Sequence, residues 1–562
     1  MRDAYRDHVP PRILKVCGAD FELGNFVLGI NDAVCSCREA SRALLAAVKG
    51  LPRRELRHYG YGSSTGTWQS AVYGGQQHSV QQYRCSADVA YHPQDWGRKF
   101  LAENGGCAYI DLDHLELCIP EVTNAWDHVA ATHAMLRIAR RALRDANDEQ
   151  PPDRKIQVLV NNSDGQGNSY GSHLNFLITR RAWENIFNRK FHYLQYLASF
   201  QVSSLVYTGQ GKAGSENGAP DTPFQLSQRA DFFERLTSLP TTFERGIVNS
   251  RDETLCGPSS YAVQPDAPTR LHSIFFDNTL AHGSCLLKTG LMQIVLAMLE
   301  AEHCDPALLL DDPVDAVVHI SHDLTLRACV ELASGMRLTA IELQERFLGD
   351  ARRFAATVGF DGVVLRADEI LDLWEDTLAK LKAGDLQKLA PRLDWVMKLM
   401  MLERALDQRK TLDWSSPEVK VLDHLYSSLD DDGLYWAYEE SGFAERLVAE
   451  DNIVRFTQSP PDDTRAWTRA MLLRCAGSEA VDSVDWDSVG FKLRGRNYWP
   501  TYRKVSLSHP LAFTRAEAEP IFRQAGDLEA VLDALEGPAS QPGSEGIALT
   551  PKPVDKPQES IN

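Results

Sequence analysis

The sequence lacks the features of a membrane-spanning, secreted or nucleic-acid-binding protein. It contains no continuous run of 18 apolar residues, and its first eleven residues carry charges but no apolar segment. A membrane-spanning helix needs about 20 mostly apolar residues, so we expect no membrane span, no secretion signal and a cytoplasmic location. Lys and Arg (59) are outnumbered by Asp and Glu (77), which gives a net charge of −18. Because phosphate backbones bind to basic surfaces, no nucleic-acid partner is expected.

Cysteines occur almost only as single residues. There are eleven, and apart from Cys35-x-Cys37 none lies within two positions of another. Zinc sites of the paired Cys-x-x-Cys type are therefore excluded, and no zinc is expected. Free thiols in a reducing compartment are the simplest interpretation.

The order of the expected elements predicts an α+β fold. The 562 residues are 43% hydrophobic and 24% charged, which is enough material for two or three globular domains. Strand and helix patterns alternate without regular βαβ spacing. We expect a catalytic domain over residues 12–425, a smaller unit over 426–536 and a disordered Pro-rich tail over 537–562. Residues 51–95, rich in Gly, Ser, Gln and Tyr, form a long insertion and a candidate lid.

A polar segment between two apolar strands gives the first indication of a site. A strand over 156–160 leads into the Gly-rich segment 161–171, and a second strand follows as the other half of a hairpin. On that strand His173 and Asn175 lie on one face, opposite Leu174, because strand side chains alternate. The excess of polar groups predicts a binding or catalytic site.

Two carboxylates lie on one face of the first strand. Asp20 and Glu22 are two positions apart, with Phe21 and Leu23 directed to the core. Such carboxylates, about 7 Å apart, repel each other unless a cation lies between them. Hard oxygen ligands favour Mg²⁺, particularly where nucleotide phosphates complete its shell. The alternative is a solvated strand face.

A second acidic cluster follows another apolar strand. Asp111, Asp113, His114 and Glu116 fall within six positions. An acid beside a metal-bound phosphate can act as general base or nucleophile, whereas the alternative is a surface turn.

Three arginines occur further along the chain. Arg229, Arg251 and Arg270 offer the fork geometry that binds phosphate or carboxylate groups. Surface ion pairs are the alternative.

Taken in order, these motifs resemble a known family. They are Gly18-x-Asp20-x-Glu22-x-Gly24, Tyr109-x-Asp111-x-x-His114-x-Glu116, Gly171-x-His173-x-Asn175, Gln228-Arg229, Asn249-x-Arg251-Asp252-Glu253 and Arg270-Leu271-His272. The chain is similar to the Pup ligase (PafA) and Pup deamidase/depupylase (Dop) family, within the carboxylate–amine ligase group related to glutamine synthetase. The resemblance extends from about Val16 to about Leu493.

The resemblance implies a fold, cofactors and residue roles. The implied fold is a glutamine-synthetase-like curved antiparallel sheet with helices on its convex face, plus a small C-terminal domain. ATP and Mg²⁺ would bind on the concave face, with Asp111 as the catalytic residue. The implied metal ligands are Asp20, Glu22, Glu116, His173 and His114. The implied nucleotide or substrate contacts are Asn175, Arg229, Arg251, Arg270 and His272.

The family has two enzymatic branches, and the Dop branch is favoured. In that branch an amide or isopeptide bond at the C-terminal Gln or Glu of a Pup-like modifier is hydrolysed, with Asp111 as nucleophile or base. The insertion 51–95 and the Asp111-x-x-His114 spacing resemble that branch. The alternatives are an ATP-dependent ligase joining the modifier to lysine or making a small amide, and a nucleotide-binding pseudoenzyme. The partners implied are a Pup-like modifier, its conjugates and the bacterial proteasome pathway.

Four positions depart from the family pattern. Cys107 stands where the family has arginine, Leu115 where it has proline, and Leu174 and His282 where it has glutamate. These departures are typical of a divergent subgroup.

Overall fold

The computed structural model describes residues 9–52, 96–256, 264–495 and 499–536. The candidate lid, from residue 53 onward, and the tail 537–562 lie outside the described residues.

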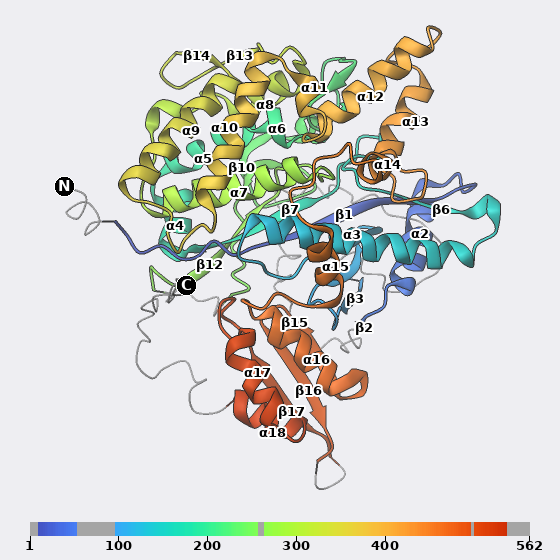
Figure 1. The fold of residues 1–562 in the computed structure, drawn as a ribbon, viewed down its shortest axis with the longest axis vertical. Coiled ribbons are helices and arrows are strands. Elements are labelled where there is room, and N and C mark those ends of the chain that lie inside the picture. Colours follow the sequence, from blue (N-terminus) through green and yellow to red (C-terminus); the bar gives the residue numbers. More distant parts are fainter. Residues whose placement is uncertain (1–8, 53–95, 257–263, 496–498, 537–562) are drawn as a thin grey trace, which may run out of the picture.

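An antiparallel sheet forms the centre of the molecule (Figure 1). Its strands are ordered β12-β7-β1-β5-β4-β3-β2, with β6 paired to the end of β1. Their bounds are β1 (Cys17–Val27), β2 (Leu51–Pro52), β3 (Trp96–Phe100), β4 (Cys107–Asp111), β5 (His114–Cys118), β6 (Ile156–Leu159), β7 (Ser172–Thr179) and β12 (Pro268–Ser273). The predicted α+β class is confirmed.

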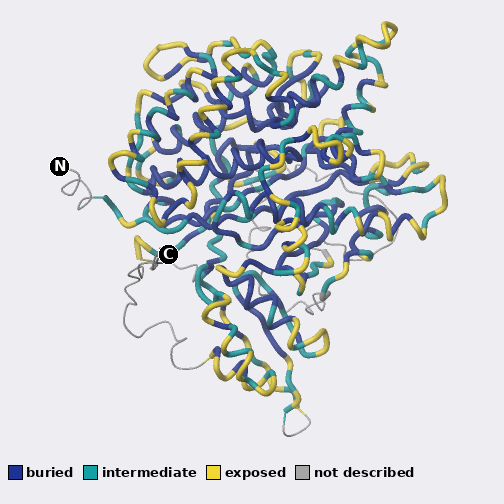
Figure 2. The backbone as a smooth tube through the Cα atoms, viewed as in Figure 1, coloured by how far each residue is buried: buried dark blue, intermediate teal, exposed yellow. Residues whose placement is uncertain are grey.

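One face of this sheet packs against helices because its side chains alternate between apolar and polar. Phe21, Leu23 and Leu174 are buried in the main hydrophobic cluster, as predicted. Helices α2 (Ala33–Ala47), α3 (Ala125–Asp148) and α7 (His282–Glu300) supply the other side of this cluster. Figure 2 shows the continuous buried layer that results. The polar side chains of the same strands therefore face the opposite way.

The predicted hairpin between the strands at 156–160 and 172–178 is wrong. β6 and β7 do not pair with each other; both pair with β1, which is eleven residues long. β6 pairs with the half Gly24–Val27 and β7 with the half Cys17–Phe21. The polar segment between them therefore leaves the sheet opposite Gly24 and returns opposite Phe21, beside the middle of β1.

Helix α7 is long and largely apolar, although polar residues such as Lys288 and Gln293 interrupt its apolar sequence. Within the described residues it alone is long and apolar enough, by length and composition, to span a membrane, with a mean hydropathy of 1.3. Every residue in that window is buried inside the protein. Burial on all sides accounts for its composition.

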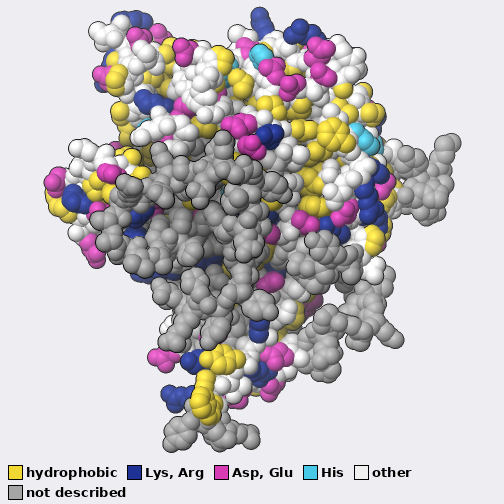
Figure 3. Space-filling view, turned by 180° about the vertical axis from the view of Figure 1, so that it is seen from behind, with side chains coloured by type: hydrophobic (Ala, Val, Ile, Leu, Met, Phe, Trp, Pro, Cys, Tyr) yellow, Lys and Arg dark blue, Asp and Glu magenta, His cyan; other side chains and the backbone are white. Residues whose placement is uncertain are grey.

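The remaining helices and short strands build a lobe on the helical side of the sheet, except for α15, which packs beside α3 (Figure 1). The helices are α4 (Arg180–Glu184), α5 (Phe191–Ser203), α6 (Leu205–Thr208), α8 (Pro313–His322), α9 (Ala340–Thr357), α10 (Ala367–Ala383), α11 (Leu386–Leu389), α12 (Asp394–Gln408), α13 (Pro417–Tyr426), α14 (Leu434–Glu440) and α15 (Glu450–Gln458). The strand pairs are β8 (Lys212–Ala213) with β9 (Phe224–Gln225), β10 (Arg235–Ser238) with β11 (Gly246–Asn249), and β13 (Cys329–Glu331) with β14 (Arg337–Thr339). On the face seen in Figure 3, acidic and basic side chains lie interspersed over the described surface.

A smaller C-terminal unit packs against the other side of the sheet. It contains α16 (Ala466–Ala480), β15 (Val481–Asp485), β16 (Ser488–Leu493), β17 (Thr501–Ser506), α17 (Arg515–Gln524) and α18 (Leu528–Leu535). Its apolar side chains share a second cluster with Phe100, Cys107, Tyr109 and Cys118 of the main sheet. Tyr426 and Phe456 instead belong to the main cluster. We therefore propose that the small unit begins near residue 466 rather than 426.

Glu121 joins this unit to the sheet, which gives a stability prediction. Its carboxylate accepts hydrogen bonds from Arg465 and Arg469, at 2.8 and 2.7 Å. Burial raises the pKa of Glu121, but the two arginines outweigh burial and lower it to about 2. Because the pKa is lowered on folding, the stabilisation is present above the unfolded value of about 4.5 and is lost as the pH falls toward 2.

Glu121→Gln should therefore lower the free energy of unfolding by roughly 3 kcal/mol at pH 7. Urea denaturation should show the difference from wild type shrinking between about pH 4.5 and 2. Glu519→Gln, which alters exposed ion pairs on α17, is the matched control and should change stability by less than about 0.5 kcal/mol. A Glu121→Gln variant as stable as wild type at pH 7 would contradict the assigned role.

Candidate active site

The polar residues predicted as a site meet on one face of four neighbouring strands. Strand pairing sets Glu22 of β1 opposite Glu116 of β5, and Asp20 of β1 opposite His173 of β7. His272 of β12 lies opposite Asn175 of β7. Alternation along each strand places these side chains on the same face of the sheet, and strand pairing sets them side by side. The polar side chains therefore lie close together.

Three carboxylates form the first group: the buried Glu22 and Glu116 and the half-buried Asp111. One oxygen from each lies within 4.8 Å of the others. Glu22 Oε2, Asp111 Oδ1 and Glu116 Oε2 are buried and have no hydrogen-bond partner among the described residues. Burial, and then the charge of Glu22, raises the pKa of Asp111 well above its ordinary value. Burial, and then the charge of Asp111, does the same for Glu116.

Such a group fits a divalent cation. Three carboxylates cannot all ionise in a buried site unless positive charge compensates them. Oxygen ligands of this kind suit Mg²⁺.

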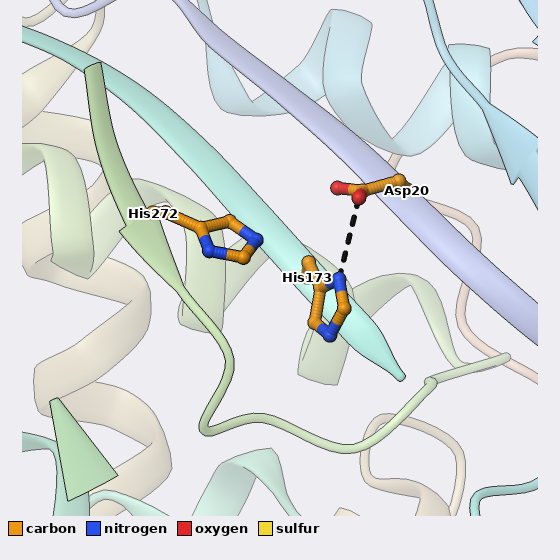
Figure 4. A group of neighbouring side chains, drawn as sticks. All are labelled: Asp20, His173 and His272. Carbon is orange, nitrogen blue, oxygen red and sulfur yellow. Dashed lines mark hydrogen bonds and ion pairs between the residues drawn. The ribbon is translucent and has the colours of Figure 1, made fainter. Parts of the chain in front are cut away.

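A second group consists of Asp20, His173 and His272 (Figure 4). His173 Nδ1 lies 3.3 Å from Asp20 Oδ2, and Asn175 Nδ2 donates to Asp20 Oδ1 at 2.7 Å. Burial raises the pKa of Asp20, but His173, His272 and Arg270 outweigh it and lower the pKa. Burial, and then Arg270, lowers the pKa of His272 well below its ordinary value. The group therefore offers a carboxylate and neutral imidazole nitrogen as ligands.

The sequence expectation placed Asp20 and Glu22 on either side of one cation. The structure instead puts them in two adjacent groups, each completed by residues from other strands. Two residues two positions apart on a strand are about 7 Å apart, whereas adjacent strands are only about 4.8 Å apart. Each carboxylate therefore lies closer to side chains of a neighbouring strand than to the other carboxylate on β1.

The turn after Asp111 holds this carboxylate in place. Leu112 and Asp113 connect β4 to β5 with φ of 46° and 70°, the left-handed conformation of a tight two-residue hairpin turn. Arg38 Nε lies 3.2 Å from Asp113 Oδ1, and Asn25 Nδ2 donates to the Asp113 carbonyl at 3.2 Å. These contacts hold a conformation that non-glycine residues seldom adopt. They explain the Asp111-x-x-His114 spacing.

His114 lies outside both groups. Its Nδ1 is 2.9 Å from the Leu23 carbonyl, and its ring stacks on Tyr170 at 4.2 Å between centroids. The structure thus does not bring this residue together with the other four predicted metal ligands.

Arg270 and Arg251 border the site. Arg270 Nη1 donates to Asn175 Oδ1 at 2.8 Å and is also paired with Glu253. Arg251 lies close enough to Asp111 for its charge to oppose the rise of that pKa.

Arg229 is buried beside a second arginine that sequence reasoning missed. Arg229 Nε lies 3.3 Å from Ser169 Oγ, and Arg245 Nη2 donates to the Ser169 carbonyl at 2.9 Å. Neither forms an ion pair with another described residue. Burial, and then Arg245, lowers the pKa of Arg229 to about 9, and burial lowers that of Arg245 to about 10. Two buried guanidinium groups favour an anion such as phosphate. Arg245 lies in no recognisable motif, so only its placement reveals it.

Gly171 leaves the space that both groups need. Its N–H donates to Glu22 Oε1 at 2.7 Å, and an added Cβ would lie 2.6 Å from both Glu22 Oε1 and His173 Nε2. Gly171→Ala should therefore displace a ligand of each group and weaken Mg²⁺-dependent nucleotide binding by at least about 10-fold. Calorimetric titration measures this. Gly349→Ala in helix α9, where the methyl meets only the end of the Arg353 side chain at 3.6 Å, is the control. Unchanged binding in Gly171→Ala would contradict the proposed geometry.

Comparison with known proteins identifies relatives of this chain. A family model described as Pup-ligase protein matches residues 15–490. The chain is 36% identical over 439 residues to the Depupylase of Acidothermus cellulolyticus, covering 78% of this chain and 83% of the relative. It is 33% identical over 425 residues to the Pup–protein ligase of Acidimicrobium ferrooxidans, covering 74% and 88%.

Solved structures of the Pup ligase PafA share its fold. One, in complex with Pup, has a TM-score of 0.71 and 23% identity over 94% of this chain and 93% of that chain. Another, in complex with ADP, has a TM-score of 0.65 and 24% identity over 80% and 98%.

Proposed function

Because the chain belongs to the Pup-ligase protein family, we propose that it is a Dop-like hydrolase dependent on ATP and Mg²⁺. It would cleave an amide or isopeptide bond at the C-terminal Gln or Glu of a Pup-like modifier, in the cytoplasm. The observation that carries the proposal is the group Glu22, Asp111 and Glu116, with three buried unpartnered oxygens. A pseudoenzyme would have little reason to retain so costly an arrangement.

Mg²⁺ would be held by Glu22 and Glu116, with Asp20, His173 and His272 available to a second ion. When bound, it supplies positive charge that favours ionised carboxylates and neutralises phosphate. The buried Arg229 and Arg245 would bind phosphate oxygens of the nucleotide. Support comes from their shared contact with Ser169 and their lack of described acidic partners.

Asp111 would perform the proton transfer. Burial and the charge of Glu22 raise its pKa, so positive charge in the site would favour its ionised, reactive form. As base, it takes one proton from water while the water oxygen bonds to the amide carbonyl carbon. The carbon–nitrogen bond then breaks, and the nitrogen leaves with that proton as ammonia or a lysine amine. As nucleophile, an oxygen of ionised Asp111 would attack the same carbon and the carbon–nitrogen bond would break, with the nitrogen taking a proton from water and leaving as ammonia or a lysine amine. The hydroxide left by that water would then cleave the acyl anhydride, which restores the Asp111 carboxylate.

The arginines at the border would orient the modifier. Arg270 already donates to Asn175, and Arg251 lies near Asp111, so either can bind a carboxylate beside the reacting bond.

A ligase remains the second candidate, since a relative named Pup–protein ligase is 33% identical. The hydrolase is favoured by the two-residue turn after Asp111 and by the higher identity to the relative named Depupylase.

One assay separates these functions. The enzyme is incubated with ATP, Mg²⁺ and a Pup-like peptide that ends in Gln or is linked through Glu to lysine. Release of ammonia or free peptide without stoichiometric ATP use is expected. ATP consumption coupled to amide formation would show the ligase, and nucleotide binding with neither reaction would show the pseudoenzyme.

A further inference from the structure

A second cluster of ligand-type side chains lies among the helices. His133 comes from α3, His282 is the first residue of α7, and Glu439 comes from α14. Their relative exposures are 0, 1 and 7%, so all three are buried. Helices α3 and α7 pack on the apolar face of the sheet, away from the two groups already described.

Each residue directs an unsatisfied polar atom at the other two. His133 Nδ1, His282 Nε2 and Glu439 Oε1 have no hydrogen-bond partner among the described residues. One ligand atom of each lies within 4.8 Å of the others, and His282 Nε2 is 3.9 Å from Glu439 Oε1. The imidazole rings meet edge to face, with centroids 4.4 Å apart.

The second nitrogen of His133 is already committed. His133 Nε2 lies 3.0 Å from the Leu280 carbonyl, which fixes its proton there and leaves the Nδ1 lone pair directed into the cluster. A backbone carbonyl that orients a histidine in this way is the usual support of a metal-bound imidazole. Burial is the first cause that lowers the pKa of both histidines, to about 4 for His282, so both rings are neutral and able to act as ligands.

We propose that His133, His282 and Glu439 form a binding site for a divalent transition-metal ion, with Zn²⁺ as the best match. Two imidazole nitrogens and one carboxylate oxygen are a known zinc ligand set, which leaves one position for water. Ligand atoms around tetrahedral zinc lie roughly 3.3 Å apart, so the 3.9 Å separation needs only a small adjustment. Imidazole ligands separate this site chemically from the carboxylate group Glu22, Asp111 and Glu116. The group Asp20, His173 and His272 on the sheet offers the same ligand types, so variants must distinguish the two sites.

The residues around the cluster must rearrange when a metal ion binds. Arg446 lies 3.6 Å from Glu439 Oε1, but Arg446 and Arg137 are both paired with Glu450, which offsets their charge. The Leu447 N–H donates to His282 Nδ1 at 3.3 Å. A metal on Nε2 places the proton on Nδ1, so this long hydrogen bond must open and the segment after α14 must shift.

His282, at the start of α7, supplies the second imidazole of the site. The three ligands are separated by about 150 residues each, so no spacing motif indicated zinc in the sequence. A metal here would tie α14 to the two core helices.

The test is Co²⁺ and Zn²⁺ binding to the full chain. Four-coordinate Co²⁺ with nitrogen ligands gives intense visible absorption, whereas Co²⁺ with oxygen ligands in octahedral geometry absorbs weakly. We expect intense absorption that is displaced by Zn²⁺ and of which one equivalent persists in His173→Gln. His282→Gln, Glu439→Gln and His133→Gln should each weaken Zn²⁺ binding by at least about 10-fold. His173→Gln on the sheet face and the exposed His319→Gln are controls that should keep the signal.

Each outcome decides the proposal. Loss of the signal in the three cluster variants alone, with wild-type circular dichroism, supports it. A signal lost in His173→Gln instead assigns the ion to the active site and overturns it. Wild-type protein without intense absorption also overturns it. If a variant unfolds, a rise in wild-type melting temperature with Zn²⁺ that survives in His173→Gln tests the same claim.

Discussion

Asp111→Asn is expected to reduce turnover by at least about 10²-fold, while nucleotide binding stays nearly intact. Asparagine can neither take a proton from water nor attack a carbonyl carbon. It keeps the shape of the side chain, so the adjacent turn and the cation ligands Glu22 and Glu116 should remain. The measurement is release of ammonia or free peptide under saturating ATP and Mg²⁺, with nucleotide affinity determined separately.

The chain offers a matched control two residues away. The Asp113 carboxylate pairs with Arg38 instead of joining the buried group, and asparagine tolerates its positive φ of 70°. Asp113→Asn should therefore keep activity within a few-fold of wild type. Full activity in Asp111→Asn would remove Asp111 from the reaction. Equal losses in both variants would point to damage of the turn.

Glu22→Gln is expected to abolish Mg²⁺-dependent nucleotide binding, because a neutral amide cannot compensate a divalent cation. Wild-type protein should gain about 2.7 kcal/mol of stability at a ligand concentration 100 times the dissociation constant, and the variant should gain none. Differential scanning calorimetry with and without ATP and Mg²⁺ measures this.

The same variant should behave oppositely without metal. Removing one of the three carboxylates relieves the repulsion that raises the pKa of Asp111. Folding raises the pKa values of Asp111 and Glu116. Metal-free wild-type protein should therefore lose stability as the pH rises above the ordinary carboxyl range. Glu22→Gln should lose less over the same range. If ATP and Mg²⁺ stabilise Glu22→Gln as much as wild type, the proposed cation site is contradicted. If the stability of metal-free Glu22→Gln falls with pH as steeply as that of wild type, the proposed repulsion among the carboxylates is contradicted.

The sequence by itself determined which residues share a strand face. Alternation placed Asp20 with Glu22, and His173 with Asn175, because the two-residue period of a strand is local. The apolar positions of β1 and β7 followed from the same periodicity. The resemblance supplied the family, which the comparisons confirm.

Only the tertiary structure decided which faces meet. Pairing of β1 with both β6 and β7, rather than β6 with β7, depends on contacts distant in sequence. Pairing of β1 with β5 on one side and with β7 on the other placed Glu22 and Asp20 in two groups. Arg245 and the cluster of His133, His282 and Glu439 belong to no motif, since their neighbours come from other parts of the chain. Local periodicity fixes the direction of a side chain, whereas long-range packing fixes what it contacts.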